Sequence, residues 1–71
     1  MADDMDVWVD YNDVDEQGRV MTLRRFFLSE SDVTVGRRVR TGDHEGNRCQ
    51  GMVVEVQPSG VVAIERVGRS G

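Results

Sequence analysis

Hydrophobic and polar residues alternate along several short runs of this chain, which is the pattern of half-buried β-strands. In the first run, residues 6–11, Val7, Val9 and Tyr11 share one face. Trp8 lies on the opposite face, between two aspartates. Because charged side chains prefer solvent, we expect the valine face to point inward and Trp8 to lie outward or at a rim.

A second run, residues 19–28, begins with the same alternation and then changes phase. Leu23 takes an inward position, but two arginines followed by two phenylalanines interrupt the pattern. A change of phase within a long strand is typical of a β-bulge or a sharp bend. We therefore expect a bend at Arg24–Arg25, with Phe26 and Leu28 pointing inward and Phe27 pointing outward.

Turn-forming residues separate these runs from three more, at 37–41, 48–57 and 61–67. Segments 43–47 and 57–60 are predicted hairpin loops, and the Ser-x-x-Asp pattern at 29–32 predicts a single helical or 3₁₀ turn. No run has a 3.6-residue period, so we predict an all-β fold with helix below about 15% of residues, against about a third in an average protein. The inward positions predict a core of Val7, Val9, Leu23, Phe26, Val39, Val54, Val56, Val62 and Ile64.

A set of glycines and valines between residues 36 and 56 has a recognisable spacing: Gly36-x-x-Val39, then Gly46, then Gly51-x-Val53-x-x-Val56. This segment resembles the KOW and Tudor-like branch of the SH3-like small barrels, in which a Gly-x-x-Val strand leads through a loop into a Gly-x-Val strand. The resemblance implies a five-stranded SH3-like small barrel. In KOW modules the loop is usually basic, whereas here residues 43–47 carry two acids and no lysine.

Length and charge narrow the possible functions. The chain has 71 residues, enough for one domain with a small core; we expect the domain to span 6–67, with disordered ends at 1–5 and 68–71. The net charge is −4, and all nine basic residues are arginines. An acidic protein is a poor generic binder of nucleic acid. A single cysteine excludes an internal disulfide, and no apolar run could span a membrane, so we expect a cytoplasmic protein without membrane contact.

Two chemical sites can be considered from residue types alone. Asp13-x-Asp15-x-Gln17-Gly18 resembles the start of a calcium loop, but the position of the closing glutamate is Arg24. His44 and Cys49 flank a predicted hairpin, yet no oriented third group or oxyanion site accompanies them. We therefore expect no catalytic residue, no metal and no cofactor.

Two surfaces could instead bind a partner. The first is an aromatic patch of Trp8 and Phe27 with Arg24 and Arg25 as its polar rim, provided that these rings are exposed rather than core. The second is an arginine stripe, for which intramolecular pairing with acids is the alternative interpretation; its members are Arg37, Arg38, Arg40 and Arg48. We expect a non-enzymatic module that binds a protein partner or forms a homodimer. The alternative is an RNA- or ribosome-associated KOW-like accessory protein.

Overall fold

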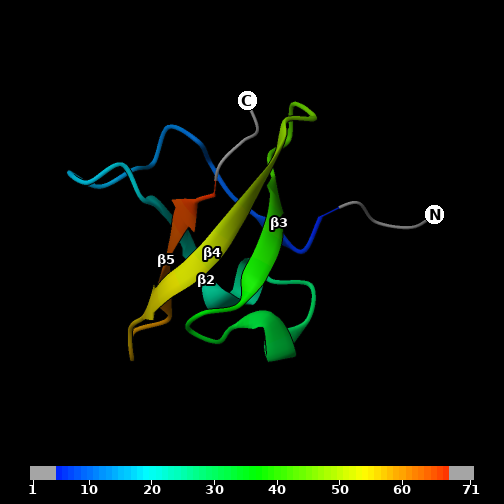
Figure 1. The fold of residues 1–71 in the computed structure, drawn as a ribbon. Helices are drawn as coiled ribbons and strands as arrows, with labels where there is room; N and C mark the ends of the chain where they lie inside the picture. The colour runs from blue at the N-terminus through cyan, green and yellow to red at the C-terminus, as the bar shows by residue number, and fades with distance from the viewer. Residues whose placement is uncertain (1–4, 68–71) are drawn as a thin grey trace.

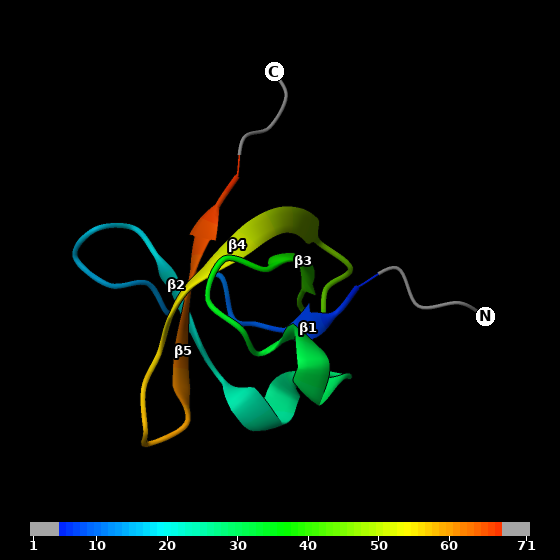
Figure 2. The ribbon, with the colours of Figure 1, turned by 60° about the horizontal axis from the view of Figure 1, so that its bottom comes forward.

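The computed structural model describes residues 5–67, which form an all-β barrel (Figures 1 and 2). Its strands are β1 (Val7–Trp8), β2 (Val20–Leu23), β3 (Arg38–Gly42), β4 (Arg48–Val56) and β5 (Val61–Arg66). The two ends that we expected to be disordered, apart from Met5, lie outside the described residues. Met5 itself is buried, with 4% of its surface exposed.

The five strands form one sheet in the order β1-β3-β4-β5-β2. β1 runs parallel to β3, and every other neighbouring pair is antiparallel. The sheet curls until its ends nearly meet, where Val7 forms a bridge to Phe27 and the Leu28 amide donates to the Asp6 carbonyl at 2.9 Å. The result is a nearly closed small barrel (Figure 2), which is consistent with an SH3-like fold in general.

The long strand β4 makes this closure possible because it bends across the molecule and pairs with β3 on one side and β5 on the other. Its pairing with β5 shifts register between Val53 and Glu55, which is a β-bulge. At Gly51 the strands approach so closely that an added Cβ would lie 2.5 Å from Cγ2 of Ile64. A glycine is therefore required at this crossing.

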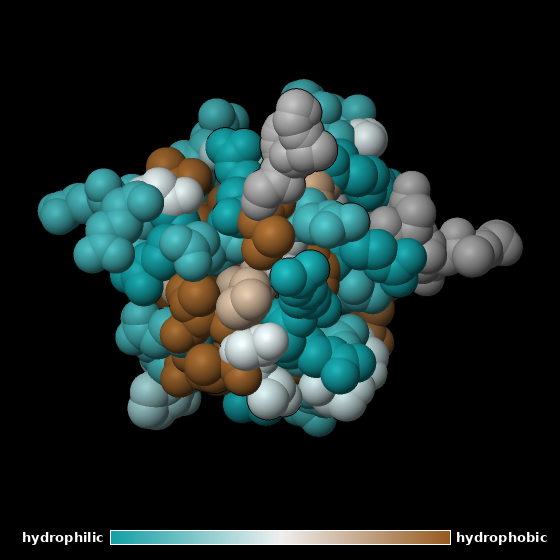
Figure 3. Space-filling model, viewed as in Figure 1, coloured by the Kyte–Doolittle hydropathy of each residue, from teal (hydrophilic) through white to brown (hydrophobic). Residues whose placement is uncertain are grey.

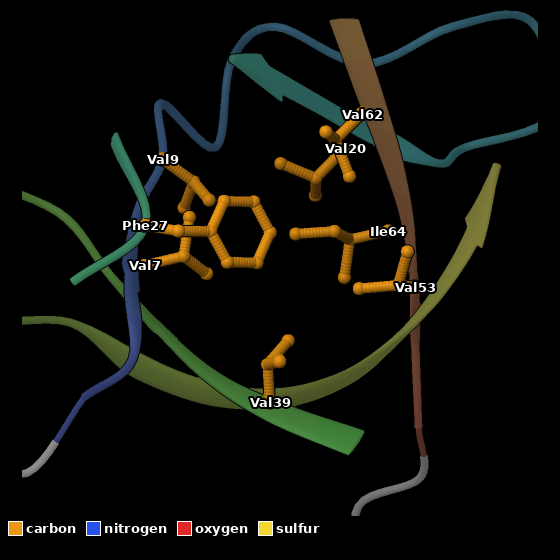
Figure 4. Close-up of a cluster of buried hydrophobic side chains, with 8 residues drawn as sticks. All are labelled: Val7, Val9, Val20, Phe27, Val39, Val53, Val62 and Ile64. Atoms are coloured by element: carbon orange, nitrogen blue, oxygen red, sulfur yellow. The ribbon is translucent and has the colours of Figure 1, made fainter. Parts of the chain in front are cut away.

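The core confirms much of the predicted set and corrects its phase in two places. Val7, Val9, Val39, Val62 and Ile64 are buried as expected, and Figure 4 shows them converging on one cluster. In β4 the bulge reverses the expected phase. Because the extra residue falls between 53 and 55, the fully buried valine is the one at position 53 rather than its predicted neighbour at position 54.

The second correction concerns the two phenylalanines. Phe27 is buried with 8% exposure and points into the cluster of Figure 4, whereas Phe26 and Leu28 are 40% and 51% exposed. The expected bend is a 3₁₀ turn, η1 (Arg24–Phe26), rather than a bulge. The turn closes with the Phe27 amide donating to the Arg24 carbonyl at 3.1 Å. It rotates the chain by about one extra residue, so Phe27 takes the inward position that we assigned to Phe26. Leu23, just before the turn, is only half-buried.

The predicted turn near residue 30 is confirmed as η2 (Glu30–Asp32), although no side chain caps it. Ser29 Oγ instead bonds Ser31 Oγ at 2.9 Å. Apart from η1 and η2, residues 5–67 contain no helix, so the low helix content is confirmed for the part of the chain that the structure describes. Both predicted hairpin loops are also present, and each contains a glycine with positive φ, Gly46 at 91° and Gly60 at 100°.

Candidate functional site

A groove lies where the two ends of the curled sheet face one another. One wall is the segment that continues from β1 through residues 8–13, and the other is β2 with η1. Thr22 Oγ1 joins the walls by donating to the Trp8 carbonyl at 2.8 Å, and the Met21 amide donates to the Asp13 carbonyl at 2.9 Å. The groove therefore follows from the topology, because β1 and β2 are the two edges of the sheet and only part of their length is joined.

The groove has a volume of about 890 Å³, within the range of about 300–1,000 Å³ that is usual for ligand sites. Aromatic and aliphatic side chains form most of its lining. They come from three separate parts of the chain and comprise Trp8, Tyr11, Met21, Leu23, Phe26 and Val61. Three of the four aromatic residues of the protein therefore line one surface, and only Phe27 is in the core.

The hairpin between β3 and β4 closes one end of the groove. His44, at the tip of this hairpin, stacks on Trp8 with ring centroids 5.0 Å apart and planes inclined by 20°. Trp8 is half-buried and lies on the outward phase of its strand, as the sequence predicted. Tyr11 shares a hydrogen bond of 2.8 Å with Thr41 Oγ1, and burial raises the pKa of its phenol. Both rings are therefore held in place by neighbours across the sheet.

Four acidic residues also line the groove: Asp10, Asp13, Asp43 and Glu45. No arginine is among its lining residues within 5–67. The Asp43 carboxylate accepts bonds from the Asn47 side chain at 3.0 Å and from two backbone amides. The Asn47 bond, together with these amides and the nearby charge of Arg48, holds the pKa of Asp43 below its usual value, so this carboxylate stays ionised.

The ion pairs between described residues use other carboxylates. They are Arg19 with Asp15 and Glu55, Arg24 with Glu30, Arg37 with Asp32, and Arg40 with Asp6. Arginines thus neutralise acids around the rest of the barrel, whereas the carboxylates at the groove form no ion pair within residues 5–67. The residues that line the groove therefore carry a net negative formal charge.

The structure brings together only part of the predicted aromatic patch. Trp8 is in the groove, but Phe27 is in the core and Phe26 takes its place on the surface. The Arg25 guanidinium lies over the Phe26 ring, 5.4 Å from its centroid, and Arg24 pairs with Glu30 at 3.3 Å. Arg25 therefore lies beside the groove through Phe26, whereas Arg24 contacts Glu30, which is not a lining residue; neither arginine lines the groove.

The residues of the arginine stripe lie on and beside β3 and at the start of β4, and all four are exposed. Arg37 Nε bonds Asp32 at 3.0 Å, and Arg40 forms a two-pronged contact with Asp6 at 2.9 and 3.2 Å. The Arg40 guanidinium holds the pKa of Asp6 below its usual value. Intramolecular pairing therefore applies to these two arginines. In Figure 3, hydrophilic residues gather over β3, and an apolar area covers the lower end of β4.

The residues of the two chemical sites considered from the sequence, the acidic loop at 13–18 and the pair His44 and Cys49, make contacts that stabilise the fold. In the acidic loop, Asp15 accepts bonds from the amides of Gln17 and Arg19 and pairs with the Arg19 guanidinium at 2.7 Å, and Gly18 has a φ of 81°. His44 stacks on Trp8, and Cys49 pairs with Thr41 in the sheet. Residues 5–67 contain no cluster of three or more His, Cys, Asp or Glu arranged to hold a metal ion.

Comparison with protein-family models, with curated proteins and with solved structures gives no match. Within residues 5–67 no helix has the length and apolar character needed to cross a membrane. The surface chemistry of this chain is therefore the basis for a functional assignment.

Sequence reasoning missed most of the groove because its residues are close only in space. Tyr11, assigned to the inward face, does pack against the core and also lines the groove, whereas Phe26, assigned to the core, is exposed there. The two reach this surface from different edges of the sheet. The acidic character of the 10–18 and 43–47 loops was visible. Their convergence around Trp8 was not, since it depends on the order of the strands.

Proposed function

We propose that this protein is a non-enzymatic binding module that holds a segment of a protein partner in the groove beside Trp8 and Phe26. The observation that carries the proposal is the concentration of aromatic side chains at one open groove. A chain of 71 residues has few large apolar side chains with which to build a core. Leaving Phe26 exposed and Trp8 and Tyr11 only partly buried loses burial energy, and binding of a partner would recover it.

The residue types support a protein rather than a reacting small molecule. Trp, Tyr and Arg are enriched where binding energy concentrates in protein interfaces, and here Trp8, Tyr11 and Arg25 lie in or beside the groove. Catalysis would require a nucleophile within reach of an oriented base. The only histidine stacks on Trp8, and the only cysteine, Cys49, does not line the groove.

A displayed library of random 12-residue peptides tests the proposal. We expect peptides to be enriched on the wild-type chain and to lose binding to the Phe26→Ser variant. A matched control, Leu28→Ser with Val35→Ser, removes apolar side chains that are 51% and 60% exposed and do not line the groove. This control should bind normally. Resonances of the Trp8 indole and Tyr11 should shift when a selected peptide is added to the wild type. Equal loss of binding in both variants, or shifts elsewhere, would contradict the proposal.

The KOW-like resemblance supports a second candidate, an RNA- or ribosome-associated accessory protein. The exposed arginines along β3 favour it, with Arg38 as a residue for which no acidic partner is seen within 5–67. The net charge of −4 and the pairing of Arg37 and Arg40 with acids weigh against it. Titration with a generic RNA separates the two candidates. Phosphate contacts give an affinity that falls steeply with salt, whereas aromatic anchors do not.

A further inference from the structure

We infer that the segment bound in the groove is basic, an extended stretch of a partner protein in which arginine or lysine alternates with apolar residues. This inference rests on the proposed function and adds the chemistry of the partner. It follows from the distribution of charge around the groove, which differs from that on the rest of the barrel.

Charge complementarity is the first step. Four carboxylates line the groove, and none of them forms an ion pair within residues 5–67, although the charge of Arg48 acts on Asp43. Asp43 is fixed in its ionised form by Asn47. Asp13, on one wall, and Glu45, on the hairpin that closes one end of the groove, are both exposed. An acidic or neutral ligand would meet repulsion or unmatched carboxylates, whereas guanidinium or ammonium groups would pair with them.

The apolar lining is the second step. Trp8, Leu23 and Phe26 line the same groove as the carboxylates. Arginine and lysine cover apolar surface with their aliphatic stems while the charged head reaches a polar group, and a guanidinium also stacks on aromatic rings. One such side chain can therefore satisfy both parts of the groove. An aliphatic neighbour two residues away in an extended segment would face the same side.

Two charge variants isolate this feature. Asp13→Asn with Glu45→Gln removes two groove carboxylates that form no ion pair within 5–67. Glu16→Gln with Glu65→Gln makes the same change in net charge at exposed residues that do not line the groove. Both pairs lie at exposed positions, so both variants should fold, which a melting curve verifies.

The experiment is a selection of random 12-residue displayed peptides, in which the informative peptides are those that bind wild type and lose binding to Phe26→Ser. We expect these peptides to contain more arginine and lysine than the input library. Their affinity should fall by about 2- to 30-fold on the groove variant, because each exposed ion pair changes an equilibrium by about 1.4- to 5-fold. Their affinity for the Glu16 and Glu65 variant should be unchanged, and added salt should weaken binding to the wild type.

The alternative outcomes are distinct. If the peptides that depend on Phe26 are no more basic than the library, or if both charge variants lose affinity equally, the inference is overturned while the groove remains a binding site. If no peptide depends on Phe26, the proposed function itself fails. A second copy of the chain is the other possible occupant of the groove, and sedimentation of the chain alone tests it. A dimer that dissociates in the Asp13 and Glu45 variant would show that a second copy fills the groove. This result also overturns the inference.

Discussion

Truncating each of the two adjacent phenylalanines in turn should give very different losses of stability. Phe27 is 8% exposed and packs among Val7, Val9 and Ile64, whereas Phe26 is 40% exposed at an open groove. Removing a buried phenyl group leaves a cavity and costs about 3–5 kcal/mol. Phe26→Ala leaves no enclosed cavity. It loses only the transfer energy of a partly buried ring, about 1–2 kcal/mol when the roughly 1.5–3 kcal/mol of full burial is scaled by exposure.

The expected gap between the two variants is therefore about 1–4 kcal/mol. A domain of 71 residues has a stability of about 4–11 kcal/mol, so Phe27→Ala could be largely unfolded. Phe27→Leu removes less volume than Phe27→Ala and should therefore cost less, which keeps the measurement possible. Urea unfolding followed by Trp8 fluorescence gives the free energies. If Phe26→Ala proves as destabilising as Phe27→Ala, the 3₁₀ turn η1 and the phase that it sets are wrong.

Three further outcomes follow from local contacts. Gly51→Ala should destabilise the barrel by about 1–3 kcal/mol, because the new Cβ would meet Ile64 at 2.5 Å; a melting curve like that of the wild type would contradict this crossing geometry. The Asp6 pKa lies below its usual value of 3.8, so its pairing contributes stability above that pH and loses it as pH falls through the folded-state pKa. Asp6→Asn should thus flatten the acid limb of stability measured by urea titration between pH 6 and 2. Millimolar calcium should cause no saturable shift of the Asp15 amide resonance, since Arg19 holds that carboxylate.

Strand positions were predictable because alternation with period two is a local property of the sequence. Three of the five predicted runs, 37–41, 48–57 and 61–67, match strands to within one residue at both ends, and the runs 6–11 and 19–28 match only at their first residue. The exceptions occur where local conformation changes the phase. The sequence around Phe26 is compatible with either a bulge or a 3₁₀ turn. The two alternatives differ in which of the two adjacent phenylalanine rings faces inward. Which valine of β4 faces inward is also ambiguous from the sequence, because the bulge after Val53 depends on how β5 pairs with β4.

The groove was only partly predictable for a different reason. The outward position of Trp8 follows from its two acidic neighbours, and this prediction is confirmed. The placement of His44 over Trp8, and of Met21 and Val61 nearby, depends on which strands become neighbours. Strand order is decided by packing of the whole chain rather than by any short segment. The acidic residues around the groove were visible in the sequence. Which of the acids form ion pairs could not be predicted, because that depends on where the arginines lie in the folded chain.

The strand order also has a consequence for how the chain folds during synthesis. β2 has β5 as its sheet neighbour, and their register joins Val20 to Ile64. At about 5–20 residues per second, β2 waits about 2–8 s for its partner to be made. During that interval its edge and the adjacent phenylalanines have no completed barrel to enter. A pairing so distant in sequence also predicts folding in milliseconds to seconds rather than microseconds.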